Sequence, residues 1–402
     1  MDKKKLAIVS TSFPESTLGL VMAMAKRGYA VGYYILSMSH KSSLVMPALE
    51  IIDSSKWRIG EMVEVSKQNK GLHGLQTYPD THVYVYRSIP MRRKGLSIVG
   101  RLQNAIAKWL IARMCYFMNS QKYELVDIVI QRDDISSLFA KHLSQSHLVF
   151  SFHEIWHDHQ TRQRLLPQVE RAITNGHKIR LFSDTALRDL RQHASLGEKQ
   201  AASIPFGLFS SYNDFGTDRF RGLTDWGNYI LYFGSIHPYK GLSILTEAVR
   251  RLAQRETEVK VVIAGSGYDQ CLNTIATDEH FLLINRFITN DELISLIRRC
   301  RFVVCPYLSA SQSGIPSTVY LFGKPIVATR VGAFPQMVIE GETGLLVTPD
   351  SVEELEEAMG RMMADEVLYN RCVAGVAEFE KYFPERSWTC IAKTYEQHFI
   401  NS

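Results

Sequence analysis

The stretch "RFVVCPYLSASQSGIPSTVYLFGKPIVAT", residues 301–329, decides the fold class. An apolar strand ends at Pro306, and small polar residues follow it. A helix is then expected from near Gly314 to Gly323, where Gly-Lys-Pro precedes a second apolar strand. Both strands are continuously apolar, as strands of a parallel sheet buried on both faces are. The stretch therefore predicts a β-α-β unit.

The same alternation extends over most of the chain. Further strands are expected in the second half at "YILYFG", "VKVVIAG", "FLLINR" and "GLLVTP", and in the first half at "KLAIVSTSF", "YAVGYYIL", "VDIVIQ", "HLVFSF" and "KIRLFSD". Capping boxes at Thr289-x-x-Glu292 and Ser351-x-x-Glu354 predict two helix starts. The polar, glycine-containing residues 208–229 are interpreted as a linker. The fold class is thus α/β, with two Rossmann-like doubly wound domains.

Composition limits the classes of function. With 402 residues the chain has room for two domains, and a net charge of +5 is too mild to predict a nucleic-acid partner. The six cysteines form no C-x-x-C pair, which suits a reducing compartment. The start "MDKKKLAIVSTSF" contains no signal peptide pattern, and no run of about 20 apolar residues predicts a membrane span. A cytoplasmic location is expected.

Two glycine-rich loops follow predicted strands and could bind a phosphate. In "FGSIHPYKG" (233–241) the backbone can approach an anion, and Lys240 can reach a diphosphate oxygen, although a surface lysine at a helix start fits as well. In "IAGSGYD" (263–269) the dinucleotide fingerprint fails because Gln270 stands at the third glycine position. The loop 305–318 places small donors, among them Gln312 and Ser313, where doubly wound sheets bind ligands.

Together with "IPFGLF" and "VGAFPQMVIEGETGLLV", these motifs resemble a GT-B glycosyltransferase of the large retaining family four, over most of 204–360. The resemblance implies an acceptor-binding domain (1–212), a domain for a nucleotide-diphosphate-sugar (213–382) and a last helix (383–402) that crosses back to the first domain. It implies a metal-independent retaining hexosyltransferase without a cofactor, in which the leaving diphosphate takes the acceptor proton. The donor-binding residues it implies are Gly234, Ser235, Lys240, Gly265, Arg286, Gln312, Ser313, Gly314 and Thr318.

The chain departs from the family pattern at two points. An arginine expected directly after Gly234 is replaced by Ser235, and Arg286 is a candidate substitute. Two glutamates expected eight positions apart are replaced by Ala310 and Thr318. A non-catalytic GT-B subunit that binds a nucleotide or a partner glycosyltransferase therefore stays as the alternative. An epimerase would need carboxylates in the loop 305–318, and there are none.

His153-Glu154-Ile155-Trp156-His157 spells the H-E-x-x-H pattern of zinc peptidases. That pattern works on a helix, whereas here the apolar strand "HLVFSF" runs directly into His153, and the third-ligand signatures are missing. No metal site is expected. The resemblance instead makes His153 a catalytic residue beside the donor sugar, together with Lys240. Ser10, Thr11, Ser12 and His157 are assigned to the acceptor side, although a polar turn fits the three hydroxyl residues equally well and the histidines could instead cap the next helix.

The segment 87–122 is basic and contains no acidic residue. Leu102, Ile106, Trp109, Leu110 and Phe117 could form one apolar stripe, interrupted by Arg113. Two interpretations stay open. A basic amphipathic helix can lie on the inner face of an anionic membrane, where a lipid-linked glycan acceptor would be found. Alternatively, the stripe packs on its own domain.

Overall fold

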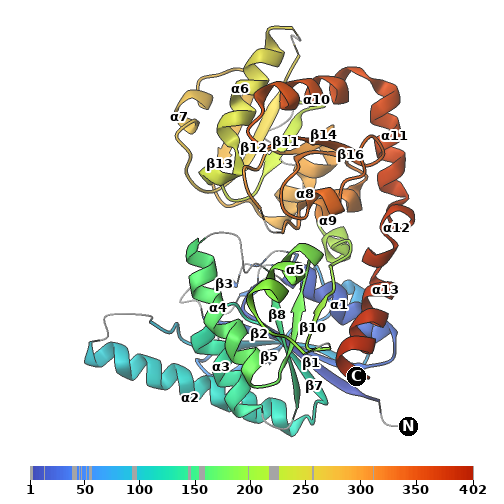
Figure 1. Ribbon diagram of the computed structural model, residues 1–402. Coiled ribbons are helices and arrows are strands. Elements are labelled where there is room, and N and C mark those ends of the chain that lie inside the picture. The colour runs from blue at the N-terminus through green and yellow to red at the C-terminus, as the bar shows by residue number, and fades with distance from the viewer. Residues whose placement is uncertain are drawn as a thin grey trace. The chain divides into compact units, whose positions relative to one another are not determined.

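The computed structural model describes residues 3–12, 14–38, 43–44, 46, 48–50, 52–53, 57–92, 97–143, 146–153, 159–197, 199–216, 226–255, 258–310 and 312–401. The chain divides into two compact units (Figure 1). The N-terminal unit comprises Met1–Asp214 and Trp388–Ser402, and the C-terminal unit Phe215–Ser387. The boundaries expected from the sequence lay after residues 212 and 382. Each unit is built on its own mostly parallel sheet, so the predicted α/β class is confirmed.

The sheet of the N-terminal unit has eight strands. In spatial order they are β10 (Ala201–Ser203), β9 (Lys178–Leu181), β8 (His147–Phe152), β7 (Leu125–Val129), β1 (Lys5–Ser10), β2 (Ala30–Ser37), β6 (Thr81–Arg87) and β5 (Met62–Glu64). All neighbours are parallel except the edge strand β5, which runs antiparallel to β6. The chain order reverses between β1 and β7, which is where doubly wound folds bind ligands. A separate short pair joins β3 (Ser43–Leu44) to β4 (Ile52–Asp53).

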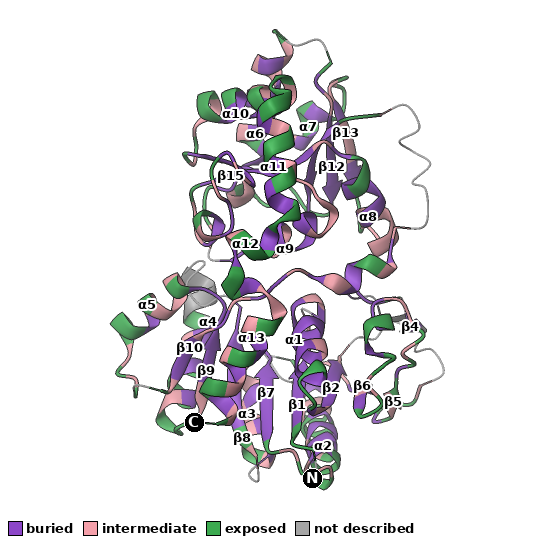
Figure 2. Ribbon diagram, turned by 90° about the vertical axis from the view of Figure 1, so that its right-hand side faces the viewer, coloured by how far each residue is buried: buried purple, intermediate pink, exposed green. Residues whose placement is uncertain are grey.

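Helices cover both faces of this sheet. They are α1 (Pro14–Lys26), α2 (Ile98–Ser120), α3 (Asp133–His142), α4 (His159–Thr174), α5 (Asp184–His193) and α13 (Trp388–Tyr395), the last continued by a π-helical turn, Glu396–Ile400. In β1, Leu6 and Ile8 join the core that contains residues of α1 and α13, whereas Ala7 and Val9 join the core of α2–α5. Because side chains alternate along a strand, an apolar strand can bury both faces. Figure 2 shows these strands coloured as buried.

The C-terminal helix α13 packs against α1 in the N-terminal unit. Its first residue, Trp388, donates its indole N–H to the Leu208 carbonyl at 2.7 Å. The indole lies where a Cβ on Gly19 of α1 would stand, 1.9 Å from Trp388 Cζ2. A glycine at this position of α1 therefore makes room for the returning helix.

The C-terminal unit contains a six-stranded, entirely parallel sheet. Its order is β13 (Phe281–Asn285), β12 (Val261–Gly265), β11 (Ile230–Phe233), β14 (Phe302–Cys305), β15 (Ile326–Thr329) and β16 (Gly344–Val347). The helices are α6 (Leu242–Ala253), α7 (Leu272–Ile275), α8 (Asn290–Arg299), α9 (Ile315–Val319), α10 (Val352–Ala364), α11 (Glu366–Ala377) and α12 (Phe379–Tyr382). This is the order of a Rossmann sheet, and the chain reverses between β11 and β14.

Two local predictions need correction. The capping box at Thr289 is complete, but at Ser351 only half of the box forms. Ser351 Oγ accepts from the Glu354 amide, whereas the Glu354 carboxylate accepts from the Thr348 amide instead of the Ser351 amide. The boundary between the two units, after Asp214, falls within the predicted linker 208–229, but the start of this stretch is packed structure with a 3-10 helix over Ser210–Asp214. Residues 217–225 lie outside the described part.

Candidate functional site

In the C-terminal unit, the loops after β11, β12 and β14 meet at the carboxyl edge of the sheet with little space between their backbones. A Cβ on Gly265 would lie 1.7 Å from the Gly234 carbonyl oxygen. A Cβ on Gly241, whose φ is +69°, would lie 1.8 Å from the Pro306 oxygen. The Leu308 amide also donates to the Tyr239 carbonyl at 2.8 Å. Glycines at these positions let the loop after β11 pack closely against the loops after β12 and β14.

Lys240 lies at the centre of this junction. It ends a 3-10 turn, Pro238–Lys240, that precedes α6. Its ammonium donates to the Tyr307 hydroxyl at 3.0 Å and lies 4.7 Å from the centre of that ring. Burial holds the pKa of Tyr307 well above its usual value, so the phenol stays neutral. The Lys240 cation is therefore fixed by a neutral partner from the neighbouring strand's loop.

The loop after β14 contributes a buried side-chain amide. Gln312 is only 9% exposed, and neither its amide oxygen nor its amide nitrogen has a hydrogen-bond partner among the described residues. A buried amide without hydrogen bonds destabilises the fold unless a ligand or a water molecule forms hydrogen bonds with it. The hydroxyl of Ser313 accepts from the Ile315 amide, and Gly314 precedes α9. In the part of the chain that the structure describes, Gln312 thus has unused hydrogen-bonding capacity, as does the buried Ser317 hydroxyl at the start of α9.

Other predicted donor-binding residues have partners within the fold. The Thr318 hydroxyl donates to the Gly314 carbonyl one helical turn earlier. Arg286, after β13, forms two hydrogen bonds with the Glu292 carboxylate, at 2.8 and 3.1 Å. The hydrogen bond from Arg286 lowers the pKa of Glu292 and ties the cation to the start of α8. Ser235 is exposed on the loop after β11. Their donor roles stay predictions.

In the N-terminal unit, the predicted acceptor-side residues follow β1. Ser10, the last residue of the strand, is buried, and its hydroxyl shares a 2.8 Å hydrogen bond with the Tyr33 hydroxyl. Thr11 and Ser12 are half-buried in the following bend. The prediction for His157 lies outside the described residues, as does Glu154.

His153 stands directly after β8, in a bend and not on a helix, which does not fit the zinc-peptidase geometry. Its ring stacks on Phe182 with centroids 4.2 Å apart, and its Nε2 lies 3.5 Å from the Ser16 hydroxyl. Burial, with the nearby Arg180 cation, lowers the pKa of His153 to about 3. The imidazole is therefore neutral at physiological pH and suited to hydrogen bonding. Within the described part of the chain, no group of three or more His, Cys, Asp or Glu residues is placed to hold a metal ion.

Sequence reasoning missed Glu15, in the first turn of α1. The side chain is partly exposed, but its Oε2 atom is buried and lacks a hydrogen-bond partner among the described residues. Burial raises the pKa of this carboxyl group to about 7. A carboxylate in a first helical turn is common, so its position in the sequence did not distinguish it.

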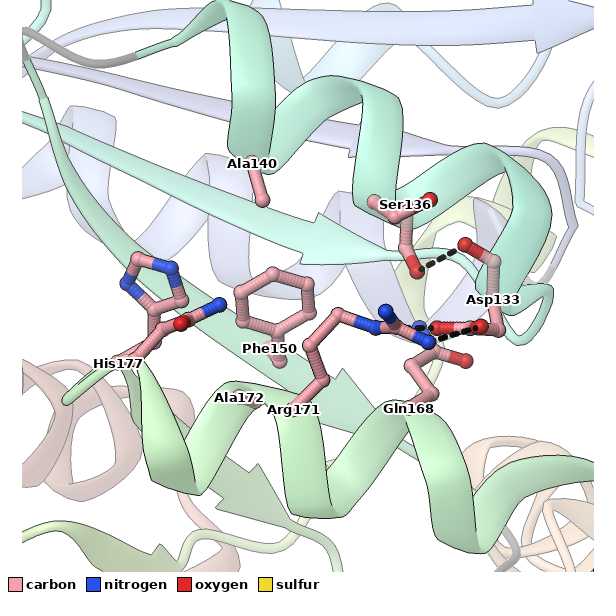
Figure 3. A pocket seen from close by; sticks show the side chains of 10 residues that line it. Asp133, Ser136, Ala140, Phe150, Gln168, Arg171, Ala172 and His177 are labelled. Atoms are coloured by element: carbon pink, nitrogen blue, oxygen red, sulfur yellow. Dashed lines mark hydrogen bonds and ion pairs between the residues drawn. The ribbon is translucent and has the colours of Figure 1, made fainter.

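A small cavity in the N-terminal unit lies away from these residues (Figure 3). It is lined by α3, α4 and β8, beside the ion pair of Arg171 with Asp133. Its volume of about 10 Å³ is at the lower limit for one water molecule. The Gln168 Oε1 atom, buried without a partner among the described residues, is a group such a water could satisfy. The cavity is too small for a sugar or a nucleotide.

Comparisons with known proteins agree with the fold. Residues 227–365 match the family described as glycosyl transferases group 1. The structure of the Anabaena protein HepE in complex with UDP and glucose superimposes with a TM-score of 0.65 over 99% of this chain and 100% of that chain, at 16% identity. Sucrose-phosphate synthase from Thermosynechococcus elongatus gives 0.62 over 100% of both chains, also at 16% identity.

Curated relatives match the chain at 24–29% identity, mostly over part of its length. An uncharacterized glycosyltransferase of Methanocaldococcus jannaschii is 29% identical over 173 residues, 42% of this chain and 48% of the relative. The D-inositol 3-phosphate glycosyltransferase of Corynebacterium glutamicum is 25% identical over 240 residues, 56% and 57% of the two chains. The chain thus spans about half the length of these relatives. For the phosphatidyl-myo-inositol mannosyltransferase of Mycobacterium leprae, the identity is 24% over 78% of this chain and 82% of the relative.

Proposed function

We propose that this chain transfers a hexosyl group from a nucleotide-diphosphate-sugar to a hydroxyl of a glycan or lipid-linked glycan, with retained configuration, in the synthesis of a surface polysaccharide. The chain has the GT-B fold, and its residues 227–365 match the group 1 glycosyltransferases. The observation that carries the proposal is the Lys240 ammonium, fixed at the switch point of the matched unit.

The donor half of the proposal rests on charge and unused hydrogen bonds. A leaving diphosphate gains negative charge as the glycosidic bond breaks, and a positioned cation stabilises that charge. Lys240 supplies such a cation, and the loop glycines let backbone amides approach the same anion. Gln312 supplies an amide oxygen and an amide nitrogen with which a nucleotide sugar could form hydrogen bonds. The same cation would serve in place of a metal ion, so we propose that transfer is metal-independent.

The acceptor half rests on the N-terminal unit. In the proposed reaction the leaving diphosphate takes the acceptor proton, so the protein needs to orient the substrates more than to exchange protons. A neutral His153, with its ring fixed on Phe182, is suited to hold a sugar hydroxyl. Ser10, Thr11 and Ser12 offer hydroxyl groups at the end of β1 for the acceptor.

A non-catalytic subunit is the second candidate. Its support is that the positions of the expected arginine and glutamates are occupied by Ser235, Ala310 and Thr318. Arg286, the candidate substitute cation, is paired with Glu292. This candidate predicts nucleotide binding without turnover, or no binding.

The test is a binding and hydrolysis screen of purified protein against UDP-, GDP-, ADP- and dTDP-sugars in the presence of EDTA, with Lys240→Ala. The matched control is Lys260→Ala. Lys260 lies just before β12, at the amino ends of the strands, and its ammonium also contacts an aromatic ring, that of Trp226. Loss of one charge-assisted contact of about 1.5–3 kcal/mol should weaken donor binding roughly 10- to 150-fold in Lys240→Ala only.

Turnover of one donor that depends on Lys240 supports the transferase. Donor binding without turnover, even when glycan and lipid-linked acceptors are supplied, favours the non-catalytic subunit. Equal losses in both lysine variants, or no binding to any donor, would contradict the role of Lys240.

A further inference from the structure

Exposed apolar side chains gather on one helix of the N-terminal unit. Of the twelve large apolar side chains that are exposed in the described part of the chain, seven lie on α2. They include Ile98, 87% exposed, Trp109, 60% exposed, and Tyr116, 79% exposed. The others are Val99, Leu102, Ile106 and Phe117. Isolated exposed apolar residues are normal, but a continuous set on one element indicates an interaction surface.

The helix has two apolar faces with different surroundings. One face, with Ala107, Ile111, Met114 and Met118, is buried against the sheet of its own unit. Leu110, a member of the predicted stripe, belongs to this buried face, as the interpretation that the stripe packs on its own domain expects. At 3.6 residues per turn, the seven exposed side chains fall within an arc of about 100° on the other side. For Leu102, Ile106 and Trp109, the interpretation that the stripe packs on its own domain is wrong, because these side chains are exposed. Phe117 lies between the two cases: it is 36% exposed, and its ring makes edge contacts with Tyr34 and Tyr84 of the same unit.

Cations lie on and beside this exposed face: at about 3.6 residues per turn Arg113 falls within the arc, whereas Arg101 and Lys108 flank it on one side. Arg101, Lys108 and Arg113 are exposed on α2, and the Arg113 guanidinium lies 5.9 Å from the centre of the Trp109 ring. None of the three forms an ion pair within the described residues, and residues 87–122 contain no acidic side chain that could partner them. Arg92, also exposed, is held beside the helix because Asn104 hydrogen-bonds its backbone amide and carbonyl. The surface therefore combines apolar side chains, aromatic side chains and unneutralised positive charge.

We propose that α2 is a membrane-docking surface, which lies in the interface of an anionic bilayer with its exposed apolar face among the acyl chains. Tryptophan and tyrosine suit the headgroup boundary, and arginine and lysine extend from it to lipid phosphates. Figure 1 shows the first turns of α2 extending beyond the other helices of the N-terminal unit, where a flat surface could reach them. No helix in the described residues is long and apolar enough to span a membrane, so the contact would be peripheral.

Charge favours a lipid surface over a second copy of the chain. A two-fold contact through α2 would bring its cations against the same cations of the partner, with no carboxylate on this segment to compensate. A bilayer that contains phosphatidylglycerol supplies the missing negative charge. The proposal concerns adsorption alone and does not depend on glycosyl transfer.

Vesicle flotation tests the proposal with the full chain. Vesicles of phosphatidylcholine alone are compared with vesicles in which about a third of the lipid is phosphatidylglycerol. We expect binding to the anionic vesicles, a loss of at least tenfold in Ile98→Ser/Trp109→Ser and in Arg101→Gln/Lys108→Gln, and a blue shift of Trp109 fluorescence on binding. The matched control is Val367→Ser, since Val367 is an exposed apolar residue of α11 in the other unit.

Several outcomes would overturn the proposal. These are equal binding to both kinds of vesicle, no binding to either, or equal losses in Val367→Ser and the α2 variants. A dimer by light scattering that requires Trp109, without vesicle binding, would assign the surface to a second copy instead. Unchanged thermal unfolding of the variants shows that any loss of binding is not a loss of fold.

Discussion

Tyr395→Phe tests how the C-terminal helix is held on the N-terminal unit. Tyr395, on α13, donates its hydroxyl to Asp127 Oδ2 at 3.0 Å. Asp127 lies inside β7, and its other oxygen accepts from the Ser151 hydroxyl at 2.6 Å. Arg180 Nη1 of β9 lies 3.7 Å from Oδ2. All four side chains are buried, so each hydrogen bond to this carboxylate replaces hydration that the folded protein excludes.

The expected magnitude follows from what remains after the substitution. Phenylalanine keeps the ring of Tyr395, and Oδ2 loses its 3.0 Å donor and retains Arg180 at 3.7 Å. A hydrogen bond to a charged group contributes about 1.5–3 kcal/mol, so the free energy of unfolding should fall by about that amount near neutral pH.

The loss should also depend on pH in a defined direction. Burial raises the pKa of Asp127, and its contacts with Arg180, Ser151 and Tyr395 lower it again in part. Tyr395 thus favours the ionised carboxylate, and its contribution is present above the pKa of Asp127 and shrinks as pH falls through it. A protonated Asp127 would accept only a neutral hydrogen bond, of roughly half the strength.

The assay is urea unfolding of wild type and variant near pH 8 and near pH 5. Tyr229→Phe is the matched control, because the buried Tyr229 hydroxyl donates to a neutral acceptor, the Leu296 carbonyl, at 2.7 Å. Its loss should be about 0.5–1.5 kcal/mol at both pH values. A loss under about 0.5 kcal/mol for Tyr395→Phe, or a larger loss near pH 5 than near pH 8, would refute the reasoning.

Two further predictions use the other perturbed groups of the N-terminal unit. Burial raises the pKa of Glu15 from 4.5 to about 7, so the wild-type protein should lose stability as pH rises between those values. In urea unfolding above pH 7, Glu15→Gln should be more stable than wild type by up to about 3 kcal/mol. Near pH 4 the variant should show no gain. Burial lowers the pKa of His153 to about 3, so the imidazole does not change its charge between about pH 5 and 9. His153→Gln should therefore lower kcat/KM while the shape of its pH dependence in this range stays the same. If the rise or the fall of the wild-type profile disappeared in the variant, the imidazole would titrate in this range.

Much of the C-terminal unit could be predicted from the sequence because its signals are local. Glycine and proline mark where each strand ends, and both strands of 301–329 form where their apolar runs predict. Between them, α9 ends at Val319, earlier than predicted, and is followed by a 3-10 helix, Tyr320–Phe322. This second helix ends at Gly323 as predicted, where a φ of +68° requires a residue that tolerates the left-handed region. The partner of Lys240 could not be predicted from local signals, because Tyr307 is 67 residues away and the contact depends on β11 and β14 being neighbours in the sheet.

The buried cluster of the N-terminal unit, formed by Asp127, Ser151, Arg180 and Tyr395, could not be predicted as a whole from the sequence. Asp127 in "LVDIV" and Arg180 in "KIRL" both interrupt buried strands, so a buried pair could have been suspected from two short stretches. Pairing them requires knowing that β7 and β9 flank β8, where Ser151 stands opposite Arg180. The fourth member, Tyr395, lies 268 residues from Asp127.

This cluster adds little net stability, and its main effect is to determine how α13 packs on the N-terminal unit. Burying a carboxylate and a guanidinium has a large desolvation cost, which an ion pair at 3.7 Å offsets only in part. Arg180 Nη2 even lacks a hydrogen-bond partner among the described residues, although the guanidinium lies 4.5 Å from the centre of the Phe182 ring and 5.5 Å from that of Tyr395. An apolar helix could pack on this sheet in several registers. A hydroxyl that must reach Asp127 restricts α13 to one, because any other register would leave the buried carboxylate without its donor. Together with the Trp388 indole, which fits beside Gly19 and donates to Leu208, the cluster thus fixes where the returning C-terminal segment docks.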